Sequence, residues 1–380
     1  MKHLEIGGST IARTINCPAW VNRSKTTIRK PAGEAANLGN LLHDAMENYY
    51  SNGETFEAQI ARGLKYADLV LTDEHLPILN KMVTATEEVL DKYNITIILC
   101  EPFVELIKDF AGGSIDMLGV SEDGKTAITL DYKTGRAPVK AKDNDQLRFY
   151  TLCATRDSKT SDMLKDVDTY VGAIVQPHVH GYTADIFEFD KEQLKSFSEV
   201  VNKAIVDTKA KKPKALAGTH CMYCPRASFC PDKRAQAKTA YLFNNKDKAA
   251  LSQAVTLAKD LKGWCNQVIE DAEFFMGEGA KIDGFKLVHG RSVRKWANSD
   301  IAEKELIDVL GESAYIKKMC SPTQAIVALK KLGIDLDYYD EIIDKPLGKI
   351  TLVEEDDPRE EINTEFINKN LNNFLTTKTK

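Results

Sequence analysis

This sequence has no long hydrophobic run, and we expect no signal peptide. Its apolar stretches, such as Ile97–Cys100, are only a few residues long, whereas a membrane-spanning helix needs roughly 20 apolar residues. The first ten residues, MKHLEIGGST, do not show the charged-then-apolar order of a signal peptide. We therefore expect a cytoplasmic protein with no membrane partner.

A strong positive charge is also missing. The chain has 51 lysines and arginines against 56 aspartates and glutamates, which gives a formal net charge of −5. This balance excludes a protein that coats nucleic acid through a basic surface as a whole, although local basic groups remain available. The glycines form no phosphate-binding loop, so no ATPase is indicated. No internal repeat is visible.

What the sequence does contain is enough material for a large core. The 380 residues are 43% hydrophobic, which suits one large domain or a core with a smaller attachment. It also contains eight cysteines. In a cytoplasmic protein these are not expected to form a disulfide framework, so cysteines that cluster indicate a metal site.

The hydrophobic pattern predicts an α/β fold with a mixed sheet flanked by helices. Helices are expected at 34–49, 55–70, 76–93, 144–154 and 192–208, and strands at 95–107, 112–120, 126–133, 167–175 and 184–189. After Cys230 the pattern becomes mainly helical, with helices at 235–276, 299–310 and 321–333 and a small hairpin at 283–296. We expect an α/β domain over 1–235 and an α-rich accessory region over 236–380 that binds DNA or a partner.

One short strand carries candidate chemistry. In Ile128–Gly135, which reads ITLDYKTG, Asp131 and Lys133 lie on the same face because side chains alternate along a strand. If the preceding strand pairs with it around Asp123-Gly124, Asp116 approaches Asp131. Converging carboxylates suit Mg²⁺, which catalyses phosphodiester hydrolysis. The Tyr132 carbonyl is a further candidate ligand, and Lys133 would orient water or stabilise charge on the phosphate. The alternative is a solvated strand face.

Five other polar residues are weak signals by themselves. His43 lies on an otherwise apolar helical face, which is typical of a core histidine. Gln146 and Tyr150 lie one helical turn apart on one face. His178 and His180 flank Val179, where contact with solvent or DNA is favoured over metal binding.

The order of these residues resembles the RecB-like branch of the PD-(D/E)XK nucleases. The matching segments are Gly39 with His43, Ile115-Asp116, Asp131–Gly135 and Gln146 with Tyr150. The resemblance implies a restriction-endonuclease-like core. It implies Asp116, Asp131 and Lys133 as catalytic residues, and His43, Asp116, Asp131 and the Tyr132 carbonyl as ligands of Mg²⁺ or Mn²⁺. It also implies that Gln146 and Tyr150 contact DNA. One departure is Asp131, where many members have glutamate.

Four cysteines form a second candidate site. Cys221, Cys224 and Cys230 have the spacing C-x2-C-x5-C, and Cys17 lies near the N-terminus. Four thiolates suit zinc or an iron–sulfur cluster, and the spacing by itself favours zinc. In the iron–sulfur members of the resembling group, one cysteine precedes the nuclease motifs and three follow them. The resemblance therefore implies a [4Fe–4S] cluster that joins the two ends of the domain, with zinc as the alternative. The other cysteines lack such spacing.

The resemblance implies a function as well as a fold. We expect a metal-dependent DNA exonuclease, with DNA that has free ends or is single-stranded as its partner and a replication or recombination protein as a second partner. Segments 284–296 and 321–322 also look like an uncharacterised phage and prophage family, which places the protein in phage replication or recombination and in the host cytoplasm. The alternative is a non-hydrolytic DNA-end-binding protein with an iron–sulfur or zinc structural module.

Overall fold

The computed structural model describes residues 4–24, 33–241 and 248–286, together with four isolated positions farther along the chain. The chain divides into two compact units, Met1–Val288 and His289–Lys380, and everything below concerns the first. The hairpin expected at 283–296 and the helices expected at 299–310 and 321–333 lie largely outside the described residues, so those predictions stay open.

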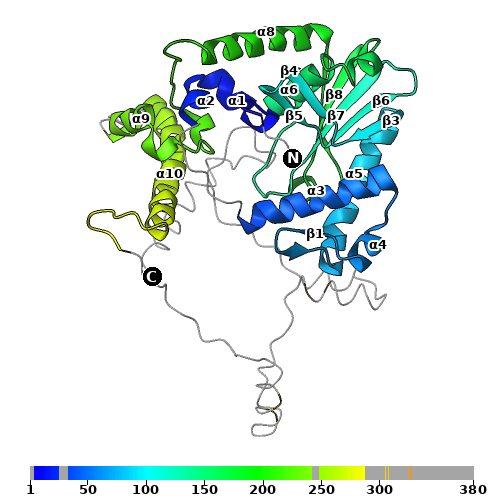
Figure 1. The fold of residues 1–380 in the computed structure, drawn as a ribbon, viewed down its shortest axis with the longest axis horizontal. Helices are drawn as coiled ribbons and strands as arrows, with labels where there is room; N and C mark the ends of the chain where they lie inside the picture. The colour runs from blue at the N-terminus through cyan, green and yellow to red at the C-terminus, as the bar shows by residue number, and fades with distance from the viewer. Residues whose placement is uncertain are drawn as a thin grey trace, which may run out of the picture. The chain divides into compact units, whose positions relative to one another are not determined.

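A five-stranded mixed sheet forms the centre of the first unit (Figure 1). In spatial order its strands are β3 (Ile95–Cys100), β6 (Met117–Ser121), β7 (Thr126–Tyr132), β8 (Thr169–Val175) and β9 (Asp185–Asp190). The β7–β8 pair is parallel and the other pairs are antiparallel. Two small two-stranded sheets complete the strands: β1 (Lys65–Tyr66) with β2 (Leu69–Val70), and β4 (Phe103–Ile107) with β5 (Ala111–Ser114).

Helices cover both faces of the sheet because β7 is apolar on both sides. Ile128 and Leu130 pack against α3 (Glu34–Asn52) and α5 (Leu76–Lys92). Ala127, on the opposite face, belongs to a second core cluster. That cluster contains residues of α1 (Gly8–Asn16), α2 (Ala19–Ser24), α6 (Asp145–Ala154) and α8 (Lys191–Thr208). The predicted fold class, a mixed sheet between helices, is confirmed at this level.

The remaining described helices are short or lie near the end of the unit. They are α4 (Phe56–Ala61), α7 (Pro177–His180), α9 (Pro231–Tyr241) and α10 (Lys248–Gly277), with the 3-10 turns η1 (Asp73–His75), η2 (Ser161–Leu164), η3 (Thr219–Cys221) and η4 (Ala227–Phe229). No helix in the described part of the chain is both long and apolar enough to cross a membrane.

Several predicted elements are correct and others are wrong. The pairing expected around Asp123-Gly124 is confirmed for its second half, because β6 pairs antiparallel with β7. The first half of the strand expected over 112–120 belongs instead to β5, which pairs with β4 in another sheet. The helix expected over 55–70 ends at Ala61 and is followed by the β1–β2 hairpin. The strand expected over 95–107 is two strands in different sheets, because Glu101 between them has a φ of 50°.

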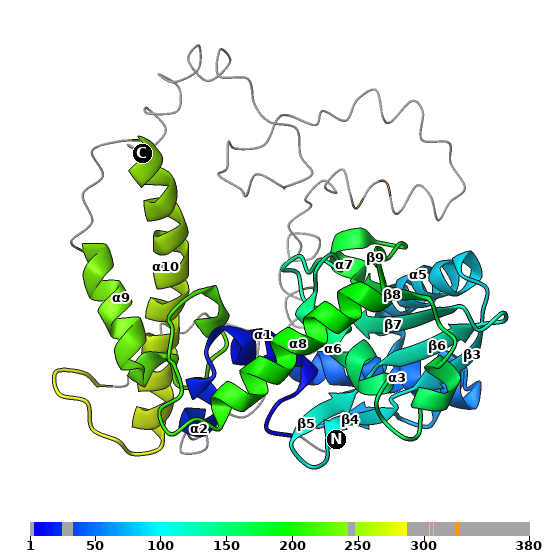
Figure 2. The same cartoon turned by 90° about the horizontal axis from the view of Figure 1, so that it is seen from above.

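We expect a domain boundary near residue 235, but the first compact unit continues past it to Val288. Helix α10 packs against the cysteine segment: Trp264 Nε1 donates to the Ala227 carbonyl at 2.9 Å, and Gln267 Nε2 donates to the Cys224 carbonyl at 2.8 Å. A buried ion pair between Lys233 and Asp260 joins α9 to α10, and Figure 2 shows these two helices side by side. Both helices are therefore part of the first unit.

Candidate active site

Two acidic residues meet where β6 begins and β7 ends. Met117 pairs with Leu130 in the antiparallel register, so the next pair outward consists of Asp116 and Asp131. At this position a side chain takes the place of a backbone acceptor between the two strands: the Tyr132 amide donates to Asp116 Oδ2 at 2.6 Å. The sheet itself thus brings together the two carboxylates singled out from the sequence.

A set of possible metal ligands surrounds Asp116. His43, Glu101 and Asp116 each offer one ligand atom, and these three atoms lie within 4.8 Å of one another. His43 Nδ1 is 3.4 Å from Asp116 Oδ1. The three residues line one small pocket with Tyr132. One imidazole nitrogen and two carboxylate oxygens are donors that suit Mn²⁺ and, through the oxygens, Mg²⁺.

Glu101 is the ligand candidate that the sequence analysis missed. It follows β3, whose last residue, Cys100, pairs with Met117 of β6. The Glu101 amide accordingly donates to the Asp116 carbonyl at 3.2 Å. The only signal that could have revealed Glu101 is this register, which depends on knowing that β3 pairs with β6.

The histidine of the G-x-x-x-H motif reaches the end of β7 from α3. His43 Nε2 lies 3.1 Å from the Tyr132 carbonyl oxygen. Gly39, one turn earlier on the same helix, has a packing role: a Cβ at this position would lie 2.9 Å from Thr134 Oγ1. Gly39 therefore allows the chain after β7 to approach α3. The Tyr132 carbonyl faces His43 here, and its role as a metal ligand stays a prediction.

Asp131 is held by a lysine and an amide. Its Oδ2 lies 2.6 Å from Lys133 Nζ, and its Oδ1 accepts from Gln146 Nε2 at 2.5 Å. Lys133 Nζ also donates to Gln146 Oε1 at 3.3 Å. Asp131 is only 3% exposed. It lies beside the set of His43, Glu101 and Asp116 but outside it, and its role as a metal ligand stays a prediction.

Burial and close charges perturb the pKa values of this site. Burial lowers the pKa of His43, but the nearby Asp116 carboxylate more than offsets this effect and raises it to about 9. Burial, followed by the Asp116 charge, raises the pKa of Glu101 to about 7. Although burial opposes it, the pKa of Asp116 is lowered by His43 and by the Tyr132 amide. Without a cation, Asp116 is therefore an anion held by protonated His43.

The two residues expected to contact DNA are partly engaged within the protein. The Gln146 amide binds Asp131 and Lys133, as described above. Tyr150 packs against Gly8 and Gly113, where an added Cβ would meet its ring. Tyr150 also lines a cavity of about 800 Å³ with Ser114 and Tyr223. Gln146 thus positions the Asp131–Lys133 pair in this structure, and DNA contact by either residue stays a prediction.

The four predicted cysteines line one cavity of about 240 Å³. Cys17 caps α1, and Cys221, Cys224 and Cys230 lie in the segment of η3 and η4. None of the four forms a disulfide. Across the described residues, the one set of three metal-ligand atoms within 4.8 Å is that of His43, Glu101 and Asp116. No three cysteine sulfurs are therefore that close together.

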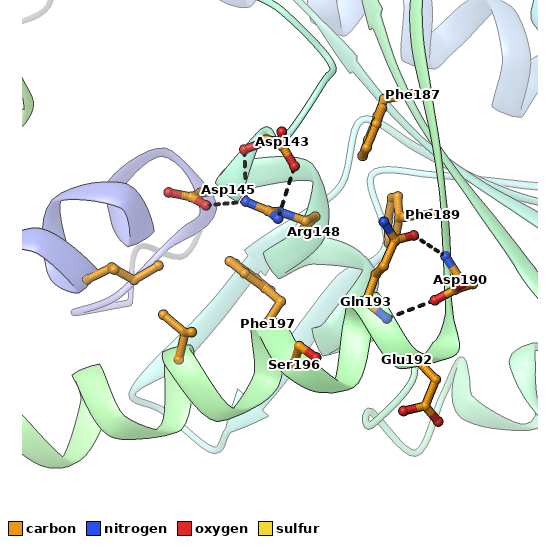
Figure 3. A pocket seen from close by; sticks show the side chains of 12 residues that line it. Asp143, Asp145, Arg148, Phe187, Phe189, Asp190, Glu192, Gln193, Ser196 and Phe197 are labelled. Atoms are coloured by element: carbon orange, nitrogen blue, oxygen red, sulfur yellow. Dashed lines mark hydrogen bonds and ion pairs between the residues drawn. The ribbon is translucent and has the colours of Figure 1, made fainter.

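A further cavity, shown in Figure 3, contains none of these residues. It has a volume of about 480 Å³, and Arg148 is its central cation. Arg148 Nη2 donates to Asp145 Oδ1 at 2.9 Å, Nη1 lies 3.5 Å from Asp143 Oδ1, and the guanidinium stacks on the Phe197 ring at 4.6 Å. Because Asp143 and Asp145 already neutralise Arg148, this cavity offers no unpaired positive charge to an anionic ligand.

The family model that matches this sequence is DUF2800, a protein of unknown function, over residues 3–360. The chain therefore belongs to the DUF2800 family. No curated protein is similar enough in sequence to count as a relative.

Three solved structures share a distant likeness. An alkaline exonuclease (LHK-Exo) from Laribacter hongkongensis is 13% identical, with 54% of this chain and 88% of that chain covered and a TM-score of 0.25. SSO0001 is 11% identical, with coverage of 59% and 95% and a TM-score of 0.23. LHK-Exo in complex with dAMP is 14% identical, with coverage of 53% and 91% and a TM-score of 0.23. These likenesses are too distant to support a function.

Proposed function

We propose that this member of the DUF2800 family is a DNA exonuclease that hydrolyses phosphodiester bonds with Mg²⁺ or Mn²⁺ at a RecB-like PD-(D/E)XK centre. One observation carries the proposal: the β6–β7 register brings Asp116 beside Asp131 and Lys133, and His43 approaches the same point from α3. The D-x-K strand is thus part of a buried constellation, which contradicts the alternative of a solvated strand face.

The donor atoms fit a divalent cation. His43, Glu101 and Asp116 would hold it, with Asp131 as the adjacent carboxylate. Bound there, the cation would neutralise charge on the scissile phosphate and activate water. The DNA substrate would have free ends or be single-stranded, in phage replication or recombination with a protein partner from that process.

Lys133 is suited to contact the phosphate as negative charge develops. Burial lowers the pKa of Lys133, but the Asp131 carboxylate more than offsets this effect, and the net pKa is raised. The ammonium group therefore stays charged at neutral pH. Asp131 and Gln146 fix its position, so little reorganisation is needed when charge builds up on the phosphate.

We also propose that Cys17, Cys221, Cys224 and Cys230 hold a [4Fe–4S] cluster. The four cysteines line one cavity of about 240 Å³ although they come from distant parts of the sequence. Four thiolates are the usual ligand set of such a cluster. Zinc is the alternative, because four thiolates also suit it.

The decisive experiment uses protein purified without oxygen and DNA labelled at one end. Single- and double-stranded substrates are incubated with Mg²⁺, with Mn²⁺ or with a chelator. We expect metal-dependent release of labelled nucleotides from the end and none with the Asp116→Asn variant. DNA that is bound but never cut would instead identify the non-hydrolytic DNA-end-binding protein.

A further inference from the structure

The loop after the catalytic strand is fastened to the end of β8 by one buried glutamine. Gln176 is fully buried. Its Nε2 donates to the carbonyls of Gly135 and Ala137 at 2.8 Å each, and its Oε1 accepts from the Val139 amide at 3.0 Å. Arg136 therefore has a fixed backbone on both sides, although its side chain is exposed.

Residues from two other elements gather beside this loop. His178 is exposed on α7, which follows Gln176 directly. Lys81 of α5 places its Nζ 5.5 Å from the ring of Tyr182, and Tyr182 is 56% exposed. We call Lys81, Arg136, His178 and Tyr182 the flanking surface.

The charges of the flanking surface have one sign. Burial, followed by the nearby charges of Arg136 and Lys81, lowers the pKa of His178. Helix α5, which carries Lys81, packs against α7, which carries His178, and the loop that carries Arg136 is bonded to Gln176 at the start of α7. Clustered cations repel one another, and a bound polyanion would relieve this repulsion. An exposed aromatic ring beside cations is also a feature of surfaces that bind nucleic-acid strands.

We infer that the flanking surface binds the phosphate backbone of a DNA strand next to the scissile bond. Arg136 follows Lys133 by three residues, so the chain separates their backbones by at most about 10 Å. That reach corresponds to a phosphate one or two nucleotides from the reacting one. This inference rests on the proposed nuclease function, and it adds where the strand continues beyond the active site.

The test measures binding in a background that cannot cleave. The Asp116→Asn variant is titrated with a fluorescent single-stranded oligonucleotide at several salt concentrations, with and without Lys81→Glu and Arg136→Glu. The control is Lys195→Glu, which reverses an exposed charge on α8. Each lost phosphate contact should reduce the slope of log affinity against log salt by about 0.7. We expect each surface variant to bind at least about tenfold more weakly at low salt.

The possible results separate the two proposals. Suppose that Asp116→Asn binds DNA and that the surface variants have the same affinity and salt dependence as Lys195→Glu. The flanking surface then does not bind DNA, and the nuclease proposal stands. If the wild-type protein neither binds nor cuts DNA, both fail. A melting temperature measured for each variant shows whether weaker binding reflects unfolding, and the milder Lys81→Gln and Arg136→Gln changes then replace the reversals.

A second inference concerns Arg13, which connects α1 to the cysteine segment. Its Nη2 donates to the Tyr223 carbonyl at 2.7 Å and its Nε donates to the His220 carbonyl at 3.3 Å. The His220 carbonyl directly precedes Cys221, and the Tyr223 carbonyl directly precedes Cys224. The Cys17 amide donates to the Arg13 carbonyl at 2.7 Å. One residue therefore links Cys17 to the turn that carries two other cysteines.

The surroundings of Arg13 suit a partner of negative charge. Its guanidinium lies 4.9 Å from the centre of the Trp20 ring, and the residue is only 9% exposed. Burial lowers the pKa of Arg13, whereas charge on Cys224, Cys221 and Cys17 raises it. Arginine stays protonated in proteins. A buried cation thus faces the cavity that the cysteines line.

We propose that Arg13 is a positioning residue that holds the cysteine turn to α1 and supplies positive charge to the thiolate set. This rests on the proposed metal role of the cysteines. Arg13→Lys keeps the charge but loses the two-directional hydrogen bonding, and Arg13→Gln loses the charge. The control is Arg62→Gln, because Arg62 is an exposed arginine paired with Glu54.

The readouts are iron content, visible absorption and reduction potential of protein prepared without oxygen. Arg13→Lys should lose iron faster than wild type at a nearly unchanged potential. Arg13→Gln should lose more than about half of its iron, and its remaining cluster should have a more negative potential because a neighbouring positive charge is gone. Iron content and potential equal to those of Arg62→Gln in both variants would overturn the role of Arg13. A wild type without metal would overturn the metal proposal too.

Discussion

The carboxylate site and the cysteine cavity are built in opposite ways. The carboxylates come from neighbouring strands and are already paired with protein cations, His43 for Asp116 and Lys133 for Asp131. The cysteines come from segments more than 200 positions apart, as the separation of 207 between Arg13 and His220 illustrates. The first site is therefore assembled by local strand pairing, whereas the second joins segments that are distant in the sequence. Loss of metal should thus abolish activity at one and loosen the fold at the other.

The largest expected effect comes from removing the shared carboxylates. Asp116→Ala or Asp131→Ala should reduce DNA cleavage by at least about 1,000-fold, because metal and catalytic groups act as a unit. The melting temperature should fall by a few degrees, because each change leaves a buried cation, His43 or Lys133, without its carboxylate partner, and relief of repulsion between the two carboxylates offsets only part of this loss. Rates of end-labelled DNA cleavage measure the first effect and thermal unfolding the second. Near-normal cleavage by either variant would show that the site lies elsewhere.

Lys133→Ala should lower turnover by about 100-fold with a much smaller loss of DNA affinity, because its charge matters most as charge develops on the phosphate. Lys133→Arg should rescue only part of the loss, since a planar fork differs from a point charge. Single-turnover rates and equilibrium binding separate the two quantities. Equal losses in both would make Lys133 a simple phosphate anchor.

The cysteine cavity is tested by single substitutions at its distant parts. Protein prepared without oxygen should absorb near roughly 400 nm and hold about four irons per chain. Cys17→Ala and Cys224→Ala should lose iron equally and make both ends of the first unit protease-sensitive, because the link between them is gone. Cys265→Ala, an exposed cysteine on α10, is the matched control. Stoichiometric zinc without iron would contradict the cluster.

Metal binding at the carboxylate site should release protons. With pKa values of about 7 for Glu101 and about 9 for His43, both groups carry protons at pH 6 that a cation must displace. Affinity for Mn²⁺ should therefore rise from pH 6 to pH 9, and about 1.5 protons should leave per metal at pH 7. Calorimetry in buffers of different ionisation enthalpy counts these protons. Affinity independent of pH would contradict ligation by these two groups.

Much of the fold follows from local pattern. The helix at α6 and the strands β7 and β8 were predicted because their apolar positions recur with a clear period. The break between β3 and β4 was not, because the left-handed conformation of Glu101 leaves no mark in a run of apolar residues. The β1–β2 hairpin was missed because its two-residue strands are too short to show alternation.

The residues of the candidate sites also divide into those that a local pattern reveals and those that depend on contacts between distant segments. Asp131 and Lys133 were predicted from alternation within one strand, and Asp116 from a local hairpin. Glu101 was missed because its place depends on β3 pairing with a strand that is not its neighbour in sequence. The four cysteines were grouped through a family resemblance, since nothing in local spacing connects Cys17 to Cys221.

The central claim is that His43, Glu101 and Asp116 form the metal site of a nuclease, and Glu101 tests it most directly because the resemblance did not suggest it. The measurement is the rate of end-labelled DNA cleavage against Mn²⁺ concentration for wild type and Glu101→Gln, with DNA affinity measured in parallel. Glu101→Gln should need at least about tenfold more Mn²⁺ for half-maximal cleavage while binding DNA as wild type does. An unchanged Mn²⁺ dependence would contradict the account.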